Sequence, residues 1–391
     1  MHHVVDDLIL LKSIGKGNYG EVFLTQKKGR SEYYATKKME RSVCERPENM
    51  KRLFHEIEIL KVLNHPNIVK FCGLKKTVNH WYLITEYCNG GSLLSNLKKY
   101  IATYKKPFPE ELVQYLMKQI VSALNYLHFN KIIHRDLKLD NILVNFPSDY
   151  DKKSLNLMNS VIKIIDFGFA TKLNGPLTFT ALGTPTNMDP KILEHINTGI
   201  PNAGYNEKVD IWSLGTLCYE MVVGHMAFSG SSMQELFLKV KKGTYSLPAT
   251  LSKEVVSFIN GMLQQDPNKR LTASQLLSHE FLTKHPSQFQ PIDVRQIPIG
   301  PGGVIRMKTI SNTTPTTQVN NINDDMLQLW AIFNQPGLYQ GIPSQMSNQV
   351  QTMVHAPSQQ QYGYMNPHMN PPQQYKIYST PVPTVNMGTY Y

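Results

Sequence analysis

The chain has 391 residues, of which 41% are hydrophobic, so it can build a sizeable core. It holds no run of about 18 apolar residues, which excludes a membrane span, and we expect no secretory signal at its start. The net charge of +11 is spread over the first 285 residues, which favours a solvated basic surface over a specific nucleic-acid site. Four cysteines without metal-type spacing favour a reducing, cytoplasmic location.

Apolar periodicity divides the chain into three parts. Residues 8–87 are predicted to form several strands and one helix, at 52–63. Residues 92–282 are predicted to be mainly helical, with long helices at 110–128 and 210–223. The boundaries we expect are therefore 1–87 for a strand-rich part, 88–285 for a helical part and 286–391 for a tail.

A glycine-rich turn lies between two apolar strands, with glycines at positions 15, 17 and 20. Glycines let backbone N–H groups approach phosphate oxygens closely, since no Cβ is in the way. After Gly20 the sequence continues as a strand, whereas a dinucleotide-binding fold would have a helix there. The turn is therefore either a phosphate site of another kind or a plain flexible hairpin.

The next strand carries Lys37, and the predicted helix carries Glu56. On a strand, Ala35 and Lys37 share one face while Lys38 points to the other, so Lys37 is the candidate for phosphate contact. An ion pair with Glu56 would fix it. Glu58 lies about 200° further around the helix, so the two glutamates cannot both face the pocket.

A polar octet from His134 to Asn141 stands between two apolar runs. In it, Asp136 could accept or orient a hydroxyl proton, Lys138 could steady a moving phosphoryl group, and Asn141 could bind magnesium. Asp166 then follows a predicted strand and starts Asp-Phe-Gly, which places a second carboxylate where a metal contact is needed.

After residue 285 the chain is rich in Gln, Asn and Pro, and we predict that residues 286–391 are disordered. One short amphipathic helix is predicted within this tail. Its apolar side chains recur at i, i+3, i+4 and i+7, and they are Met326, Leu329, Trp330 and Phe333. This helix could dock in a partner groove, or the cluster could be a chance feature of a biased composition.

From about Asp7 to Leu282, these motifs in this order resemble the eukaryotic protein kinase family. The resemblance implies an α+β fold with two lobes, the small one β-rich with one regulatory helix and the large one helical. It implies ATP and Mg²⁺ as cofactors and proteins as substrates. It also implies an ATP site built from these residues: Ile14, Gly15, Gly17, Gly20, Val22, Ala35, Lys37, Thr85, Glu86, Cys88 and Leu143.

The resemblance further implies which hydroxyls are phosphorylated. Lys138 and Gly183-Thr184-Pro185 are similar to serine/threonine kinases. Thr180, with Thr178 as a competitor, matches an activation-loop phosphorylation site, and Arg135 would pair with its phosphate. The insert at 146–160, among other features, also resembles the autophagy-initiating (ULK-type) kinases.

One position departs from the family pattern. Where the family has a glutamate that pairs with a buried arginine, this chain has Lys191, and the expected arginine is Arg270. Two cations would then face each other, unless Asp189 or Glu194 takes the place of the glutamate. The alternative function is therefore a catalytically weak kinase-fold scaffold, although every residue that phosphoryl transfer needs is of the required type.

Overall fold

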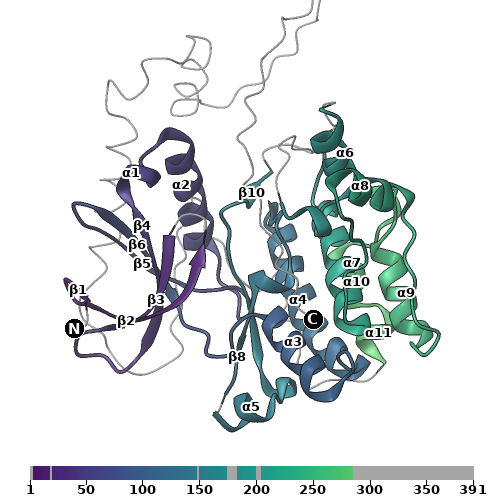
Figure 1. Ribbon diagram of the computed structural model, residues 1–391, viewed down its shortest axis with the longest axis horizontal. Helices are drawn as coiled ribbons and strands as arrows, with labels where there is room; N and C mark the ends of the chain where they lie inside the picture. Colours follow the sequence, from purple (N-terminus) through teal and green to yellow (C-terminus); the bar gives the residue numbers. More distant parts are fainter. Residues whose placement is uncertain (1–2, 18–19, 148, 174–182, 200–203, 285–391) are drawn as a thin grey trace, which may run out of the picture. The chain divides into compact units, whose positions relative to one another are not determined.

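The computed structural model describes residues 3–17, 20–147, 149–173, 183–199 and 204–284 (Figure 1). The chain divides into two units, Met1–Gln335 and Pro336–Tyr391, and every described residue lies in the first. The predicted boundaries at 87 and 285 stay predictions.

The first part is an antiparallel sheet with strand order β1-β2-β3-β4-β6-β5. Its strands are β1 (His3–Val5), β2 (Leu8–Gly17), β3 (Gly20–Lys27), β4 (Tyr33–Glu40), β5 (Phe71–Lys76) and β6 (His80–Glu86). Strands β2 and β3 form the hairpin that the glycine-rich sequence predicts, and Gly17 pairs with Gly20 at its closed end. The strand reading of this turn is therefore confirmed.

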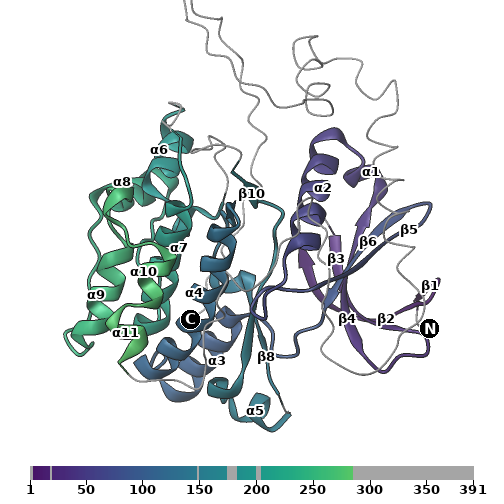
Figure 2. The same ribbon diagram turned by 180° about the vertical axis from the view of Figure 1, so that it is seen from behind.

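Two helices, α1 (Arg41–Cys44) and α2 (Pro47–Val62), follow the fourth strand. Helix α2 was expected at 52–63 and begins five residues earlier, because Pro47 sits at its first turn, where proline's fixed φ favours helix and its missing N–H costs nothing. Its apolar face, with Leu53 and Ile57, packs on the sheet against Trp81 (Figures 1 and 2). The sheet therefore holds α2 in place.

The rest of the described chain is mainly helical. Its helices are α3 (Leu93–Tyr104), α4 (Glu110–Phe129), α5 (Asp149–Ser154), α6 (Pro190–Thr198), α7 (Lys208–Val223), α8 (Met233–Lys242), α9 (Lys253–Met262), α10 (Ala273–Leu277) and α11 (Glu280–Thr283). Its short strands are β7 (Ile132–Ile133), β8 (Ile142–Asn145), β9 (Val161–Ile164) and β10 (Thr171–Lys172). A sheet followed by helices confirms the predicted α+β kinase fold class.

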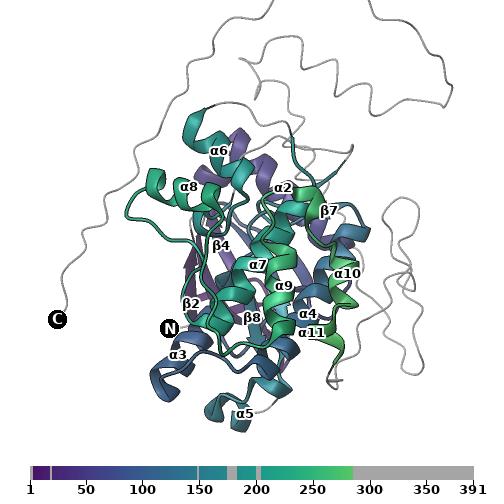
Figure 3. The ribbon, with the colours of Figure 1, turned by 90° about the vertical axis from the view of Figure 1, so that its right-hand side faces the viewer.

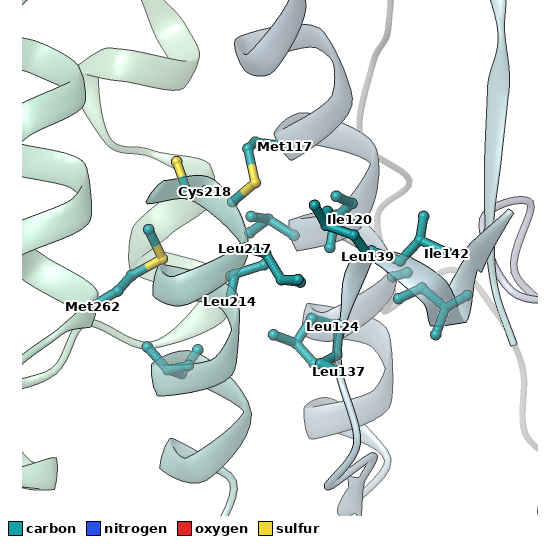
Figure 4. Packing of buried hydrophobic residues seen from close by; sticks show 14 of the residues in the cluster. Met117, Ile120, Leu124, Leu137, Leu139, Ile142, Leu214, Leu217, Cys218 and Met262 are labelled. Atoms are coloured by element: carbon teal, nitrogen blue, oxygen red, sulfur yellow. The ribbon is translucent and has the colours of Figure 1, made fainter. Parts of the chain in front are cut away.

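Helices α4 and α7 form the centre of the larger core. Both were predicted from periodicity, and their observed limits differ from the prediction by two residues at most. Helix α7 is apolar on nearly all sides, as expected of a helix with packed neighbours all around it. Figure 4 shows Leu124 of α4 and Leu217 of α7 with Met262 of α9 in this cluster, and α9 also packs against α11 (Figure 3). None of the described helices has the length and apolar character needed to cross a membrane.

Candidate active site

A cavity of about 560 Å³ opens between the hairpin β2–β3, helix α2 and the segments that carry the polar motifs. Most of the predicted ATP-site residues line it, namely Ile14, Gly15, Val22, Ala35, Lys37, Thr85, Glu86, Cys88 and Leu143. Asp136, Lys138 and Asp166 line the same cavity, whereas Gly17, Gly20 and Asn141 are not among its lining residues. The fold thus brings together side chains that lie more than 150 positions apart in the chain.

The predicted ion pair is present. Nζ of Lys37 lies 3.9 Å from Oε2 of Glu56, a residue that is only 7% exposed. Burial raises the pKa of the Glu56 carboxyl; Lys37 opposes this shift and nearby Asp166 adds to it. Glu58 is exposed, so the helix presents Glu56 and not Glu58 to the pocket, as predicted.

Asp136 is the centre of a hydrogen-bonded cluster. Nζ of Lys138 donates to its Oδ2 at 2.8 Å, and the amide of Asn141 donates to the same oxygen at 2.9 Å. Oγ1 of Thr184 donates to its Oδ1 at 2.5 Å and itself accepts from Nζ of Lys138 at 2.8 Å. Asp136 and Lys138 therefore hold one threonine hydroxyl between them, a contact that the sequence did not reveal.

Two residues of the site have left-handed backbone conformations, with φ of 68° at Arg135 and 63° at Asp166. Such conformations cost about 1–3 kcal/mol for residues other than glycine, so the surrounding structure must hold them. The carboxylate of Asp210 does this for Arg135, because it accepts hydrogen bonds from the backbone N–H groups of His134 and Arg135 at 2.9 and 2.8 Å.

Asp210 is fully buried, and burial acts to raise its pKa. The hydrogen bond with His128, at 3.0 Å, and the charges of nearby histidines outweigh burial and lower the pKa of Asp210. The carboxylate therefore stays ionised and keeps accepting from the backbone of the loop that carries Asp136.

An aromatic contact lies behind the site. The rings of His134 and Phe167 meet edge to face, with centroids 5.0 Å apart, and both residues are fully buried. Leu60 and Phe71 belong to the same core. This packing holds the segment that begins at Asp166 against the loop that ends at Asn141, so the two metal candidates lie on neighbouring segments.

Lys163 is a functional candidate that the sequence analysis missed. Its Nζ lies 2.8 Å from Oε1 of Glu86, the last residue of β6, and the same oxygen accepts the backbone N–H of Lys70 at 2.7 Å. The ion pair links β9 to the segment that lines the cavity beside Cys88. A lysine within the otherwise apolar strand Val161–Ile164 was the one signal available in the sequence, since a charge among apolar side chains needs a partner.

Arg270, the arginine expected to lack its usual glutamate partner, has an acidic partner. It is paired with Asp189, and the two side chains are 0% and 1% exposed. The guanidinium also donates to the carbonyls of Gln264 and Lys208, at 2.7 and 2.9 Å, and stacks over Trp212. Every part of the buried charge is thus compensated, which is the condition under which such a pair is tolerated.

Asp189 serves two functions with one carboxylate. Its Oδ2 pairs with Arg270, while its Oδ1 accepts the backbone N–H of Lys191 at 2.8 Å and caps helix α6. Lys191 itself is exposed, so the expectation that two cations face each other is wrong. Glu194 pairs with Lys241 at the surface, which leaves Asp189 as the substitute among the two acids considered.

Some predicted sites fall outside the described residues. These are Thr178, Thr180 and the tail residues Met326, Leu329, Trp330 and Phe333. Their roles stay predictions. Within the described ranges, no group of three or more His, Cys, Asp or Glu side chains is arranged to hold a metal ion. Any metal at Asn141 and Asp166 would need further oxygen ligands from its substrate.

An antiparallel sheet followed by helices, with a cavity that holds a Lys–Glu pair and an Asp–Lys–Thr cluster, is the arrangement expected of a phosphotransferase of the kinase class. The protein kinase domain model matches residues 8–282, and the chain belongs to the protein kinase family. A domain of this family uses ATP.

Two relatives support this assignment. The chain is 32% identical over 281 residues to the probable serine/threonine-protein kinase MARK-A of Dictyostelium discoideum, a match that covers 71% of this chain and 24% of that protein. It is 30% identical over 284 residues to Aurora kinase A-B of Xenopus laevis, which covers 73% of this chain and 64% of that protein. The chain thus spans less than two thirds of either relative. Neither relative is of the autophagy-initiating type, so that resemblance stays a prediction.

Proposed function

We propose that this protein transfers the γ-phosphate of ATP to serine and threonine hydroxyls of protein substrates. The observation that carries the proposal is the contact of Asp136 and Lys138 with the hydroxyl of Thr184. A substrate hydroxyl that replaced Thr184 would meet a carboxylate able to accept its proton and an ammonium able to steady the transferred phosphoryl group.

Nucleotide binding is proposed for the other lining residues. Val22, Ala35 and Leu143 would sandwich the adenine, Thr85 would stand at the back of its pocket, and the backbone of residues 86–88 would bind its edge. Lys37, held by Glu56, would contact the phosphates, and the glycines at 15, 17 and 20 would cover them.

Asn141 and Asp166 are suited to bind magnesium. Asn141 and Asp166 offer amide and carboxylate oxygens, which are the ligands that Mg²⁺ prefers, and ATP phosphates would complete its coordination. The bound ion would neutralise charge that develops on the phosphates. The chain's own part is to hold the two side chains, through the bond from Asn141 to Asp136 and the buried ring of Phe167.

A catalytically weak scaffold is the second candidate, because Lys191 replaces the family's glutamate. The pairing of Asp189 with Arg270 weakens this reading, since the buried arginine keeps a partner. The two functions predict different results in one measurement. Both allow ATP binding, but only the kinase transfers phosphate.

The test is incubation of the purified full chain with Mg-ATP labelled at the γ-phosphate and a generic basic protein. We expect label on serine and threonine, and none with Asp166→Ala. Nucleotide binding by wild type without transfer would instead establish the scaffold. Transfer that is unchanged in Asp166→Ala would show that another protein in the sample is responsible.

We also propose a cytoplasmic location, supported by four cysteines that are all free, as expected in a reducing compartment. Three of them, Cys44, Cys88 and Cys218, are buried, and burial raises the pKa of the Cys44 thiol to about 11 and that of Cys88 to about 12. Such thiols are mostly protonated and are suited to packing rather than to redox chemistry.

A further inference from the structure

A second cavity lies far in the sequence from the motifs of the active site. It is a groove of about 780 Å³ along helix α9, and apolar side chains of Leu247, Leu251, Val256 and Leu271 contribute to its lining. Ala249 and Ser257, both exposed, lie at the same groove. The phosphoryl-transfer chemistry uses none of these residues, so the groove is free to serve another purpose.

We propose that this groove binds the chain's own tail through the short amphipathic helix predicted at 325–333. The described structure ends beside this groove. Lys284, its last residue, is paired with Glu254 in the first turn of α9, and His279, the N-cap of α11, lines the groove. The chain therefore leaves the domain beside the surface in question.

The tail is also long enough to reach the groove. Residues 285–325, a stretch of 41 residues, connect Lys284 to the first apolar residue of the predicted helix. A flexible chain of this length has a root-mean-square span of about 35 Å, which is ample for a return to α9. Tethering at this length gives an effective concentration on the order of 1 mM, so a groove affinity of about 100 µM would keep the helix bound roughly nine-tenths of the time.

The predicted tail helix and the groove are chemically complementary. The predicted helix presents one apolar stripe with Trp330 at its centre, and the groove offers aliphatic side chains along α9. Asp324 and Asp325 precede the stripe, and from residue 294 onward they are the tail's only acidic residues. Lys253 lies at the groove in the first turn of α9, where a lysine faces the positive end of the helix and gains from an acidic neighbour.

The tryptophans supply a direct measurement. The chain has three, and Trp81 and Trp212 are both fully buried. Fluorescence that a neutral quencher such as acrylamide can reach therefore reports mainly on Trp330. In the full chain we expect Trp330 to be protected, with a quenching constant about tenfold below that of a variant in which the groove is blocked.

Matched substitutions separate docking from general effects. Ala249→Arg fills the groove with a long charged side chain, whereas Thr250→Arg adds the same side chain at the neighbouring exposed position, which does not line the groove. We expect the first to raise the quenching constant about tenfold, as the bound fraction implies, and the second to leave it unchanged. In the tail, Leu329→Asp should act like Ala249→Arg, and Gln328→Asp, on the opposite face of the predicted helix, should not.

Three outcomes would overturn the proposal. If acrylamide quenches Trp330 fully in the wild-type chain, the tail does not bind the groove, which is then available to another partner. Equal quenching constants in Ala249→Arg and Thr250→Arg would show that Trp330 packs against a different surface. Protection that disappears on dilution would assign the contact to a second copy of the chain. None of these readouts depends on kinase activity, so the proposed function can stand or fall separately.

Discussion

The pairing of Asp189 with Arg270 leads to the sharpest stability prediction. Asp189→Asn removes the negative charge but retains an oxygen that can cap helix α6, since asparagine and aspartate cap about equally well. The substitution therefore leaves the guanidinium of Arg270, which has 0% exposure, without a counter-charge. It tests the ion pair and not the cap.

The expected loss is large. Removing one partner of a buried ion pair costs about 3–5 kcal/mol, because the remaining charge stays buried without compensation. For a domain of this size, each kcal/mol shifts the melting temperature by roughly 2–4 °C, so Asp189→Asn should lower it by roughly 6–20 °C. Asp189→Ala should cost about 1 kcal/mol more, since it also removes the cap.

Two surface substitutions serve as controls in the same thermal unfolding assay. Glu194→Gln removes a carboxylate whose pair with Lys241 is exposed, and it should change stability by less than about 1 kcal/mol. Lys191→Glu restores the residue typical of the family. Because Lys191 is exposed and Arg270 is already paired, the gain should stay below about 1 kcal/mol, from a favourable acid in the first turn of α6.

The reverse pattern would contradict the pairing of Asp189 with Arg270. If Asp189→Asn melts with the wild type while Lys191→Glu raises the melting temperature by roughly 6 °C or more, position 191 would be the true partner of Arg270. The double variant Asp189→Asn with Lys191→Glu adds a direct check. It should melt within roughly 4 °C of Asp189→Asn alone, because a carboxylate at position 191, on the exposed side of α6, cannot reach the buried guanidinium.

Three further predictions concern the site and its support. Asp136→Asn should lower kcat about 10²–10⁴-fold with little change in the KM for ATP, measured by steady-state kinetics; an unchanged kcat would remove Asp136 from the chemistry. Lys163→Met should raise the KM for ATP more than it lowers kcat, because it releases Glu86 beside the cavity, and Lys163→Arg should restore the value; equal loss in both variants would argue against an ion-pair role. His65 is a buried histidine outside the site, and its Nδ1 accepts the backbone N–H of Asn67 at 3.1 Å. Burial lowers the pKa of His65 to about 4 from 6.5, so between these pH values the unfolded chain binds a proton that the native chain does not, and stability should fall by about 3 kcal/mol as pH drops from 6.5 towards 4. His65→Asn should flatten that slope in denaturant titrations, and an identical slope would show that folding does not lower the pKa of His65.

Much of this protein could be predicted because its motifs are local. Gly15 to Gly20 and His134 to Asn141 are contiguous segments whose residue types and spacing define phosphate chemistry, and the apolar periods of α4 and α7 fix their limits within two residues. The start of α2 was missed, since the helix signal was read from its apolar face and not from Pro47.

Contacts between distant residues required the tertiary structure. Spacing along the chain left Asp189 and Glu194 equally suitable partners for Arg270, and only the fold buries the first and exposes the second. Likewise Lys163 reads as one charge in an apolar strand until β9 comes to lie beside Glu86. Sequence determines which groups are available and their local geometry, whereas burial decides which charges must pair, because the cost of an unpaired charge appears only once water is excluded.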